Sequence, residues 1–67
     1  MSIKERIEEK VEELREECAD QTADELYDNA RNYHLWALGS DDDEEAEEYE
    51  ITADAFRILA REKERGN

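Results

Sequence analysis

Proline is absent from this 67-residue chain, and its only glycines are Gly39 and Gly66. Because proline and glycine are the residues that most strongly interrupt helices, their scarcity favours long helical segments. The alternation of apolar and polar residues that is typical of a half-buried strand occurs nowhere over a useful length. The sequence therefore predicts an all-α protein, and its length predicts one domain.

Cysteine and long apolar runs are also scarce. Cys18 is the only cysteine, so no disulfide can form within the chain, and a reducing compartment is the simplest expectation. The first ten residues, MSIKERIEEK, lack the apolar core of a signal peptide. No apolar run approaches the roughly 20 residues that cross a bilayer. We therefore expect a cytoplasmic protein that does not bind a membrane.

Basic residues are few, since nine Lys and Arg side chains stand against 22 Asp and Glu side chains and the net charge is −13. Phosphate backbones and anionic membrane surfaces are bound through lysine and arginine, so direct nucleic-acid binding is not expected. A partner should be basic or be contacted through apolar faces. Apolar residues still make up 37% of the chain, which favours a folded domain over disorder.

The first apolar stripe recurs at spacings of 4, 4, 3 and 4, which predicts a helix over residues 3–19. Asp20 and Gln21 interrupt this pattern. Such a narrow stripe on a charged helix needs a partner surface to remain helical. The residues of the stripe are Ile3, Ile7, Val11, Leu14 and Cys18.

A second helix is predicted over residues 23–38. Thr22 and Glu25 form a capping-box pattern before it, and Gly39 supplies a C-terminal stop. Leu35 and Trp36 lie off its apolar stripe, so its last turns are apolar over most of their circumference. This pattern is typical of a central helix or of one that carries an interface.

Ser40 is the next N-cap candidate, and a third helix is predicted over residues 41–65. Ile51 and Ile58 lie roughly opposite its main apolar stripe, seven residues apart. This back stripe has no obvious place inside a three-helix monomer, so it predicts either a homodimer or a partner protein. Together with Leu35 it is assigned to an oligomer interface. We expect a three-helix bundle, or a helical hairpin with a third helix docked on it, that forms a homodimer.

The strongest feature is the acidic run in SDDDEEAEEYE, residues 40–50. Eight of the ten side chains from 41 to 50 are carboxylic acids, and no base interrupts them. Seven like-charge pairs at i,i+3 or i,i+4 would cost roughly 1.5–3.5 kcal/mol in total, and the helix macrodipole offsets this only in the first turn. A cost of this size favours a binding role for the carboxylates of Asp41, Asp42, Asp43, Glu44, Glu45, Glu47, Glu48 and Glu50.

The charge density of this run is close to that of nucleic acid. At a rise of 1.5 Å per residue, the run carries about one carboxylate per 1.9 Å, whereas duplex DNA carries about one charge per 1.7 Å. A helix of this kind could occupy a basic groove built for nucleic acid. Trp36 lies near the run and is a candidate apolar contact, although packing in the core or in a dimer is the commoner role of such a residue. Four glutamates of the first helix could extend the acidic surface: Glu9, Glu12, Glu13 and Glu16.

The small size, the helical pattern and the acidic run together resemble phage-encoded acidic inhibitors, such as DNA-mimicking anti-CRISPR proteins. The resemblance is one of overall character, and no single residue is carried over from it. It implies a non-enzymatic inhibitor that covers the nucleic-acid surface of a basic host complex. The alternative is a small helical oligomerisation or subunit module from a salt-loving organism, in which the acids only maintain solubility.

Enzymatic and metal-binding roles are weakly supported. A calcium loop aligned from the start of the acidic run would have Ala46 and Thr52 where glycine and glutamate are needed. The paired E-x-x-E spacing within residues 44–48 resembles half of the magnesium cluster of all-α nucleotide pyrophosphohydrolases, but the other half is missing. His34 and Cys18 occupy apolar stripes, as packed side chains do. The sequence therefore predicts no catalytic residue, metal site or cofactor.

Overall fold

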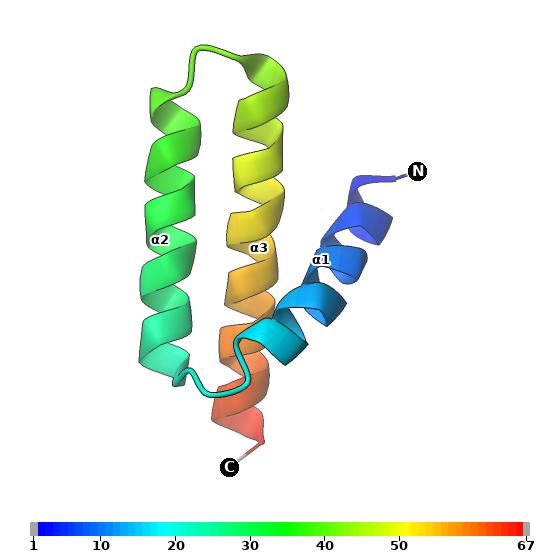
Figure 1. Ribbon diagram of the computed structural model, residues 1–67, viewed down its shortest axis with the longest axis vertical. Helices are drawn as coiled ribbons and strands as arrows, with labels where there is room; N and C mark the ends of the chain where they lie inside the picture. Colours follow the sequence, from blue (N-terminus) through cyan, green and yellow to red (C-terminus); the bar gives the residue numbers. More distant parts are fainter. Residues whose placement is uncertain (1, 67) are drawn as a thin grey trace.

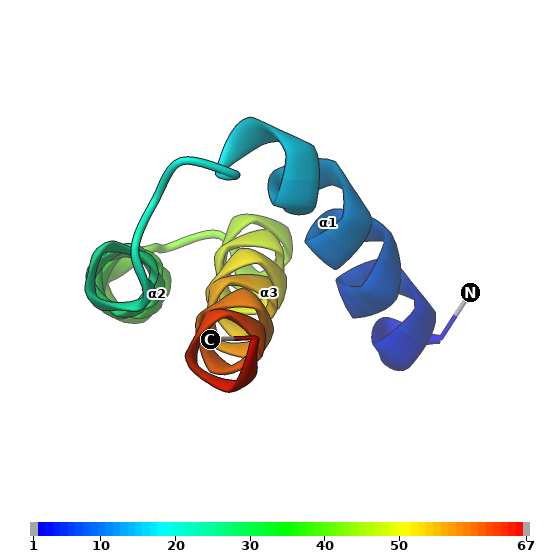
Figure 2. The same ribbon diagram turned by 90° about the horizontal axis from the view of Figure 1, so that it is seen from below.

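The computed structural model describes residues 2–66 and contains three α-helices: α1 (Ile3–Glu17), α2 (Ala23–Gly39) and α3 (Asp43–Arg65). α2 and α3 run antiparallel as a hairpin, and α1 crosses the other side of α3 at an angle (Figure 1). Viewed along the hairpin, α3 lies between the other two helices (Figure 2). The all-α prediction is confirmed, since no strand occurs among the described residues. The architecture is a helical bundle built as a hairpin with α1 docked on it.

The starts of α1 and α2 are fixed by side-chain caps. The Ser2 hydroxyl accepts a hydrogen bond from the backbone N–H of Glu5 at 3.2 Å. Thr22 and Glu25 form the predicted capping box, in which each side chain accepts a hydrogen bond from the other residue's backbone N–H. Because these bonds satisfy N–H groups that have no partner within the helix, they set where each helix begins.

The start of α3 differs from the prediction. Asp42, not Ser40, is the N-cap, and its carboxylate accepts hydrogen bonds from the backbone N–H groups of Glu44 and Glu45. The Ser40 hydroxyl bonds instead to the backbone of Asp42 and holds the preceding turn. A carboxylate at the N-cap is favoured by the positive end of the helix dipole. As a result, Asp41 lies outside the helix in which it was predicted.

The helix ends also differ by small amounts. α1 ends at Glu17 with Cys18 as its C-cap, two residues before the predicted end. Gly39 is the last residue of α2 and not a stop beyond it, and its φ is not positive. Ser40 adopts an extended conformation instead and turns the chain away from the helix. The predicted stop therefore lies one residue later and needs none of the conformational freedom of glycine.

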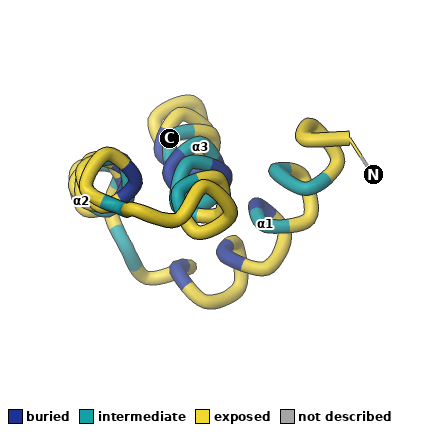
Figure 3. Tube along the Cα trace, turned by 90° about the horizontal axis from the view of Figure 1, so that it is seen from above, coloured by how far each residue is buried: buried dark blue, intermediate teal, exposed yellow. Residues whose placement is uncertain are grey.

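α3 is the central helix, so the alternative that α2 is central is wrong. The backbones of α1 and α2 each approach α3 and not each other. Their buried positions lie on the sides that face α3 (Figure 3). α3 accordingly has two buried sides, whereas α1 and α2 each have one. The buried residues of α3 are Ile51, Ala53, Ala55, Phe56, Leu59 and Ala60.

The prediction that Ile51 forms an oligomer interface is wrong, because Ile51 is only 4% exposed within the single chain. Ile51 lies one turn after Glu48 and one turn before Ala55, so these residues share a face of α3. Arg6 of α1 pairs with Glu48, and Ala55 belongs to the same core cluster as residues of α1. α1 therefore covers the back stripe for which the sequence suggested no place in a monomer.

Ile58 lies at the edge of the face that α1 covers. It is 36% exposed and lines a shallow hollow together with Val11 of α1. Leu35, the third predicted interface residue, is 51% exposed on α2. Two of the three residues predicted for an oligomer interface are thus partly accessible in the single chain.

An aromatic cluster joins the middle of the hairpin. The ring of Tyr33 stacks on that of Phe56, with centroids 5.5 Å apart and an interplanar angle of 23°. Tyr33 also meets Trp36 edge to face, with centroids 5.0 Å apart. Such aromatic pairs add about 0.5–1.5 kcal/mol beyond the area they bury. Among residues 2–66, no helix has both the length and the apolar character needed to cross a bilayer.

Candidate functional site

The acidic run forms the turn before α3 and the first two turns of that helix. Seven of its eight carboxylate-bearing residues are exposed, and Glu50 is half-buried. Ala46 and Tyr49, the two other residues of the run, are half-buried and attach this end of α3 to the rest of the hairpin. The exposed carboxylates are therefore fixed to a packed helix at one end of the molecule (Figure 1).

One base of α1 reaches this acidic surface in space, although no base interrupts the run in sequence. The guanidinium of Arg6 donates to Glu47, with 2.7 Å between Nη1 and Oε1, and to Glu48 through Nη2. Arg6 thus neutralises part of the repulsion between these two glutamates. The sequence carried no signal for this contact, because helical periodicity does not say which side of α3 receives α1.

Glu50 is paired as well, since its Oε1 lies 2.7 Å from Nδ1 of His34 on α2. The expectation that His34 is partly buried is confirmed, and its contact with Glu50 links α2 to α3. Asp42 is engaged as the N-cap of α3. Four of the eight predicted partner-binding carboxylates therefore have structural roles within the chain: Asp42, Glu47, Glu48 and Glu50.

Glu45 contacts an aromatic ring and not a base. The Glu45 carboxylate favours the protonated phenol of Tyr49, as an acceptor for its O–H and through its negative charge, and so raises the pKa of Tyr49. Tyr49 also lies beside Trp36, with ring centroids 6.1 Å apart. These contacts bring Trp36, which the sequence placed only near the acidic run, next to one of its carboxylates.

Asp41, Asp43 and Glu44 make no side-chain ion pair or hydrogen bond to any described residue. They form the part of the predicted binding surface that is not paired within the described chain, and we call them the free carboxylates. Because Asp41 lies outside α3, two of the seven predicted like-charge pairs are lost and five remain, at roughly 1–2.5 kcal/mol in total. Arg6 offsets part of this remainder, so the folding cost is smaller than the sequence predicts.

A second acidic surface lies on α1, where a hollow is lined by four glutamates: Glu5, Glu8, Glu9 and Glu12. Only two of these residues, Glu9 and Glu12, belong to the predicted extension. Oε2 of Glu13 instead lies 3.7 Å from Nζ of Lys10 on the same helix. The backbone of the first turns of α1 diverges from α3 (Figure 1), although Arg6 still reaches Glu47 and Glu48. Among residues 2–66, no group of three or more potential ligand side chains is arranged to hold a metal ion.

The C-terminal end of α2 exposes three large apolar side chains. Leu35 is 51% exposed, Trp36 55% and Leu38 71%. We call these three residues the α2-end patch. Leu38 was missed as a surface residue, because its spacing matches the apolar stripe of α2. At the last turn of a helix there is little neighbouring backbone to cover such a side chain, so periodicity alone does not bury it.

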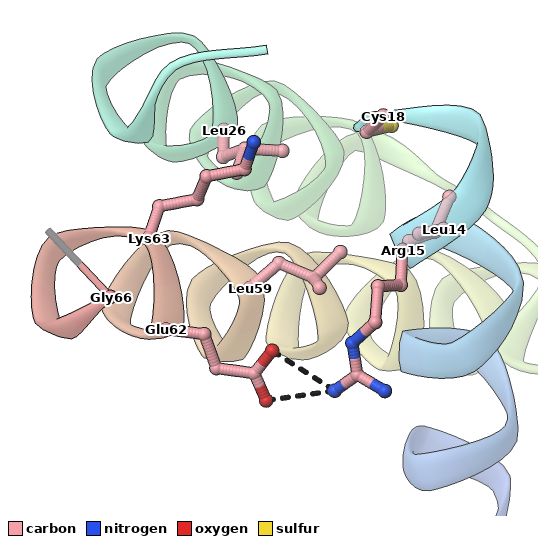
Figure 4. Close-up of a pocket in the computed structure, with 8 residues that line it drawn as sticks. All are labelled: Leu14, Arg15, Cys18, Leu26, Leu59, Glu62, Lys63 and Gly66. Carbon is pink, nitrogen blue, oxygen red and sulfur yellow. Dashed lines mark hydrogen bonds and ion pairs between the residues drawn. The ribbon is translucent and has the colours of Figure 1, made fainter. Parts of the chain in front are cut away.

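A hollow of about 280 Å³ lies at the opposite end of the molecule (Figure 4). Leucines of all three helices line it, namely Leu14, Leu26 and Leu59, together with Cys18. On its rim, Nη2 of Arg15 donates to both carboxylate oxygens of Glu62 at 2.9 Å. Nζ of Lys63 donates to the carbonyl oxygen of Ala19 at 2.6 Å. Both rim cations are thus already engaged in holding the helices together.

Cys18 is 8% exposed at this hollow, as expected for a packed thiol. Burial raises its pKa, and the neighbouring carboxylate of Glu17 raises it further, whereas Lys63 acts in the opposite direction. A thiol held in its neutral form is a poor nucleophile, because the thiolate is the reactive species. Cys18 therefore lacks the lowered pKa that activates a cysteine nucleophile.

No protein-family model, curated protein or solved structure matches this chain. The function is therefore inferred from the physical properties of its surfaces.

Proposed function

We propose that this protein is a non-enzymatic inhibitor that binds a basic, nucleic-acid-handling protein and occupies the surface on which that protein holds nucleic acid. The observation that supports this proposal is the placement of the free carboxylates in the first turn of a packed helix and in the short connection just before it. Their positions are set before any partner arrives, so binding would require little further ordering. In this respect the protein resembles DNA-mimicking inhibitors, and it would act in the cytoplasm alongside its partner.

The charge spacing still supports mimicry of nucleic acid when α3 begins at Asp43 and not at Asp41. Six carboxylates fall within residues 43–50, a stretch of about 12 Å, which is about one charge per 2 Å. Duplex DNA carries about one charge per 1.7 Å. Because Arg6 pairs with Glu47 and Glu48, the effective density is lower. The positions that best present uncompensated charge are the free carboxylates, in the first turn of α3 and just before it.

The inhibition needs no chemical step. A basic groove attracts the acidic end of α3 from a distance, which raises the association rate at low salt. Once bound, the helix excludes nucleic acid because both would need the same lysines and arginines. Such a complex weakens as salt rises, since screening shortens the range of the attraction to about 8 Å at physiological ionic strength.

A second candidate is a small helical oligomerisation or subunit module that forms a homodimer. The exposure of Leu35 and the partial exposure of Ile58 favour this candidate, whereas the buried Ile51 no longer does. In such a module the acids would only maintain solubility, as in proteins of salt-loving organisms. The two candidates differ in their response to salt: the inhibitor's complex weakens, and the module becomes more stable.

The test compares two triple variants that change the net charge equally. Asp41→Asn, Asp43→Asn and Glu44→Gln neutralise the free carboxylates and spare the N-cap and the Arg6 pairs. The matched control neutralises Glu17, Asp20 and Asp28, which are exposed and lie away from the acidic run.

Each variant is used to capture partners from a lysate of the source organism at low and high salt. A captured protein is then assayed for duplex-DNA binding in the presence of the wild type or of each variant. We expect the wild type and the control to displace DNA and the free-carboxylate variant to fail. Equal displacement by both variants would show that overall charge is responsible and would reject the proposed surface.

A further inference from the structure

Leu35 and Leu38 of the α2-end patch lie on the side of α2 that faces away from α3, and Trp36 lies at the edge of this side, beside Tyr49 of α3. His34 and Ala37 point toward α3, since His34 contacts Glu50 and Ala37 is only 8% exposed. At about 100° per residue, the three side chains of the patch cover roughly 160° of the remaining circumference. An apolar surface of this kind beside charged residues is typical of a protein-binding site.

The patch is continuous with the acidic surface. Trp36 lies beside Tyr49, and Glu45 lies one turn before Tyr49 on the same face of α3. On the other side, Leu38 precedes Asp41 by only three residues. The short connection between α2 and α3 therefore places apolar side chains and the free carboxylates at the same end of the molecule (Figure 1).

The charge around the patch determines which occupant fits. Two copies that met through their patches would bring two sets of free carboxylates together, on chains that each carry a net charge of −13. A stable interface of standard size also buries about 800 Å² per partner, which three partly exposed side chains do not supply by themselves. A basic occupant has neither problem, because its cations add favourable contacts beyond the edge of the patch.

We propose that the α2-end patch and the free carboxylates together form one docking surface for a basic amphipathic helix of the partner protein. The apolar stripe of that helix packs on Leu35, Trp36 and Leu38, and its lysines and arginines face Asp41, Asp43 and Glu44. Nucleic-acid-binding proteins commonly present basic helices to DNA. This inference rests on the proposed function and adds a source of specificity, since charge alone attracts any basic protein.

Trp36 is the only tryptophan of the chain, so its fluorescence reports directly on the patch. The probe is a synthetic helix of about 18 residues, or five turns, with leucine on one face and lysine on the other. A control peptide has glutamine at each leucine position and the same charge. We expect the Leu/Lys peptide to shift the Trp36 emission to shorter wavelength. We also expect it to bind roughly tenfold more tightly than the Gln/Lys peptide, which leaves the emission unchanged.

Variants separate the two parts of the surface. Leu35→Gln with Leu38→Gln should weaken Leu/Lys peptide binding roughly tenfold and leave Gln/Lys peptide binding unchanged. The matched control is Ile3→Gln, which alters a 56%-exposed apolar residue on α1 and should change neither affinity. The free-carboxylate variant should weaken binding of both peptides. Because all of these positions are exposed, each variant should keep the helical circular dichroism of the wild type.

Three results would overturn the docking surface. The first is an unchanged Trp36 emission with equal affinity for the two peptides, which would leave the acidic inhibitor standing and remove only the apolar contribution. The second is a shift to shorter wavelength that follows protein concentration without any peptide, because a second copy would then cover the patch. The third is unchanged peptide binding by the free-carboxylate variant, which would also contradict the proposed function.

Discussion

α1 and α2 pack on opposite sides of the same helix by different means. The contact between α2 and α3 is made by small residues and rings: Ala30 and Ala53 are 2% and 0% exposed, and Tyr33 stacks on Phe56. α1 contributes only Val11 and Leu14 as buried helix residues. Ile7 packs on the same core while partly exposed. Ion pairs between partly exposed side chains, formed by Arg6 with Glu47 and Glu48 and by Arg15 with Glu62, add further links to α3.

The difference implies that the two interfaces respond to different conditions. Burial of apolar surface is not weakened by charge screening, whereas exposed ion pairs contribute about 0–1 kcal/mol each and are screened. We therefore expect the hairpin to define the stability of the molecule and α1 to be the helix that opens first. The acidic end of α3 is attached to the more stable of the two interfaces, as a preformed binding surface requires.

Replacing Phe56 with alanine should cause the largest loss of stability. Phe56 is 4% exposed and stacks on Tyr33, so the change leaves a cavity in the hairpin and should lower the free energy of unfolding by about 3–5 kcal/mol. Urea unfolding followed by circular dichroism measures this loss. Leu38→Ala is the control and should change stability by less than about 0.5 kcal/mol, since Leu38 is 71% exposed. A loss of less than about 1 kcal/mol for Phe56→Ala would contradict the hairpin core.

Ile51→Ala should come next, with a loss of about 2 kcal/mol or more in the free energy of unfolding. This variant tests the face of α3 that α1 covers. Hydrogen exchange should become faster at the amides of α1 and change less at those of α2, because the two helices contact different sides of α3. Ile58→Ala removes a 36%-exposed side chain from the edge of the same face and should cost clearly less. Equal costs for the two variants would mean that Ile51 is not covered by α1.

Arg6→Gln should lower stability by only about 0.2–1 kcal/mol, because the paired side chains are partly exposed. The loss should disappear near 1 M salt, where the Debye length falls to about 3 Å. Lys4→Gln serves as the control, since it removes the same charge from an exposed position on the same helix. A loss that persisted at high salt would show that the aliphatic part of Arg6 stabilises α1 by packing.

The smallest expected effect is on the reactivity of the Cys18 thiol and its contribution to stability. Because burial raises its pKa, less thiolate is present at pH 8 than for a free cysteine, and alkylation by iodoacetamide should be slower than in the urea-unfolded chain. The direction in which pH changes the stability follows from the same raised pKa. The folded state favours the neutral thiol, so this contribution is present below the unfolded pKa and is lost as pH rises through the folded pKa. Alkylation at equal rates in the folded and unfolded chains would contradict the burial of Cys18.

Local patterns in the sequence were sufficient to predict the helices. Periodicity placed each helix to within two residues, and the capping box at Thr22 was predicted correctly. The start of α3 was less certain, because Ser40, Asp41 and Asp42 are all good N-cap residues. Only the geometry of the turn selects Asp42, whose carboxylate reaches two backbone N–H groups while Ser40 holds the turn itself.

The candidate site was predicted in part. The acidic run and its exposure follow from charge, since carboxylates without partners remain in water. The roles of individual carboxylates do not follow, because Arg6 and His34 come from other helices. Ile51 was assigned to an oligomer interface for the same reason: a second apolar stripe requires a partner, and the sequence does not say whether that partner is another chain or α1.

The sequence by itself therefore determined the helical class, the approximate helix boundaries and the concentration of negative charge in residues 41–50. These properties depend on residues within a few positions of one another along the chain. Only the tertiary structure decided that α3 is central, that α1 covers Ile51, and that Asp41, Asp43 and Glu44 are the carboxylates of the acidic run that are not paired within the described chain. These outcomes depend on how three amphipathic helices share their apolar faces, which is a property of the whole chain and not of any one segment.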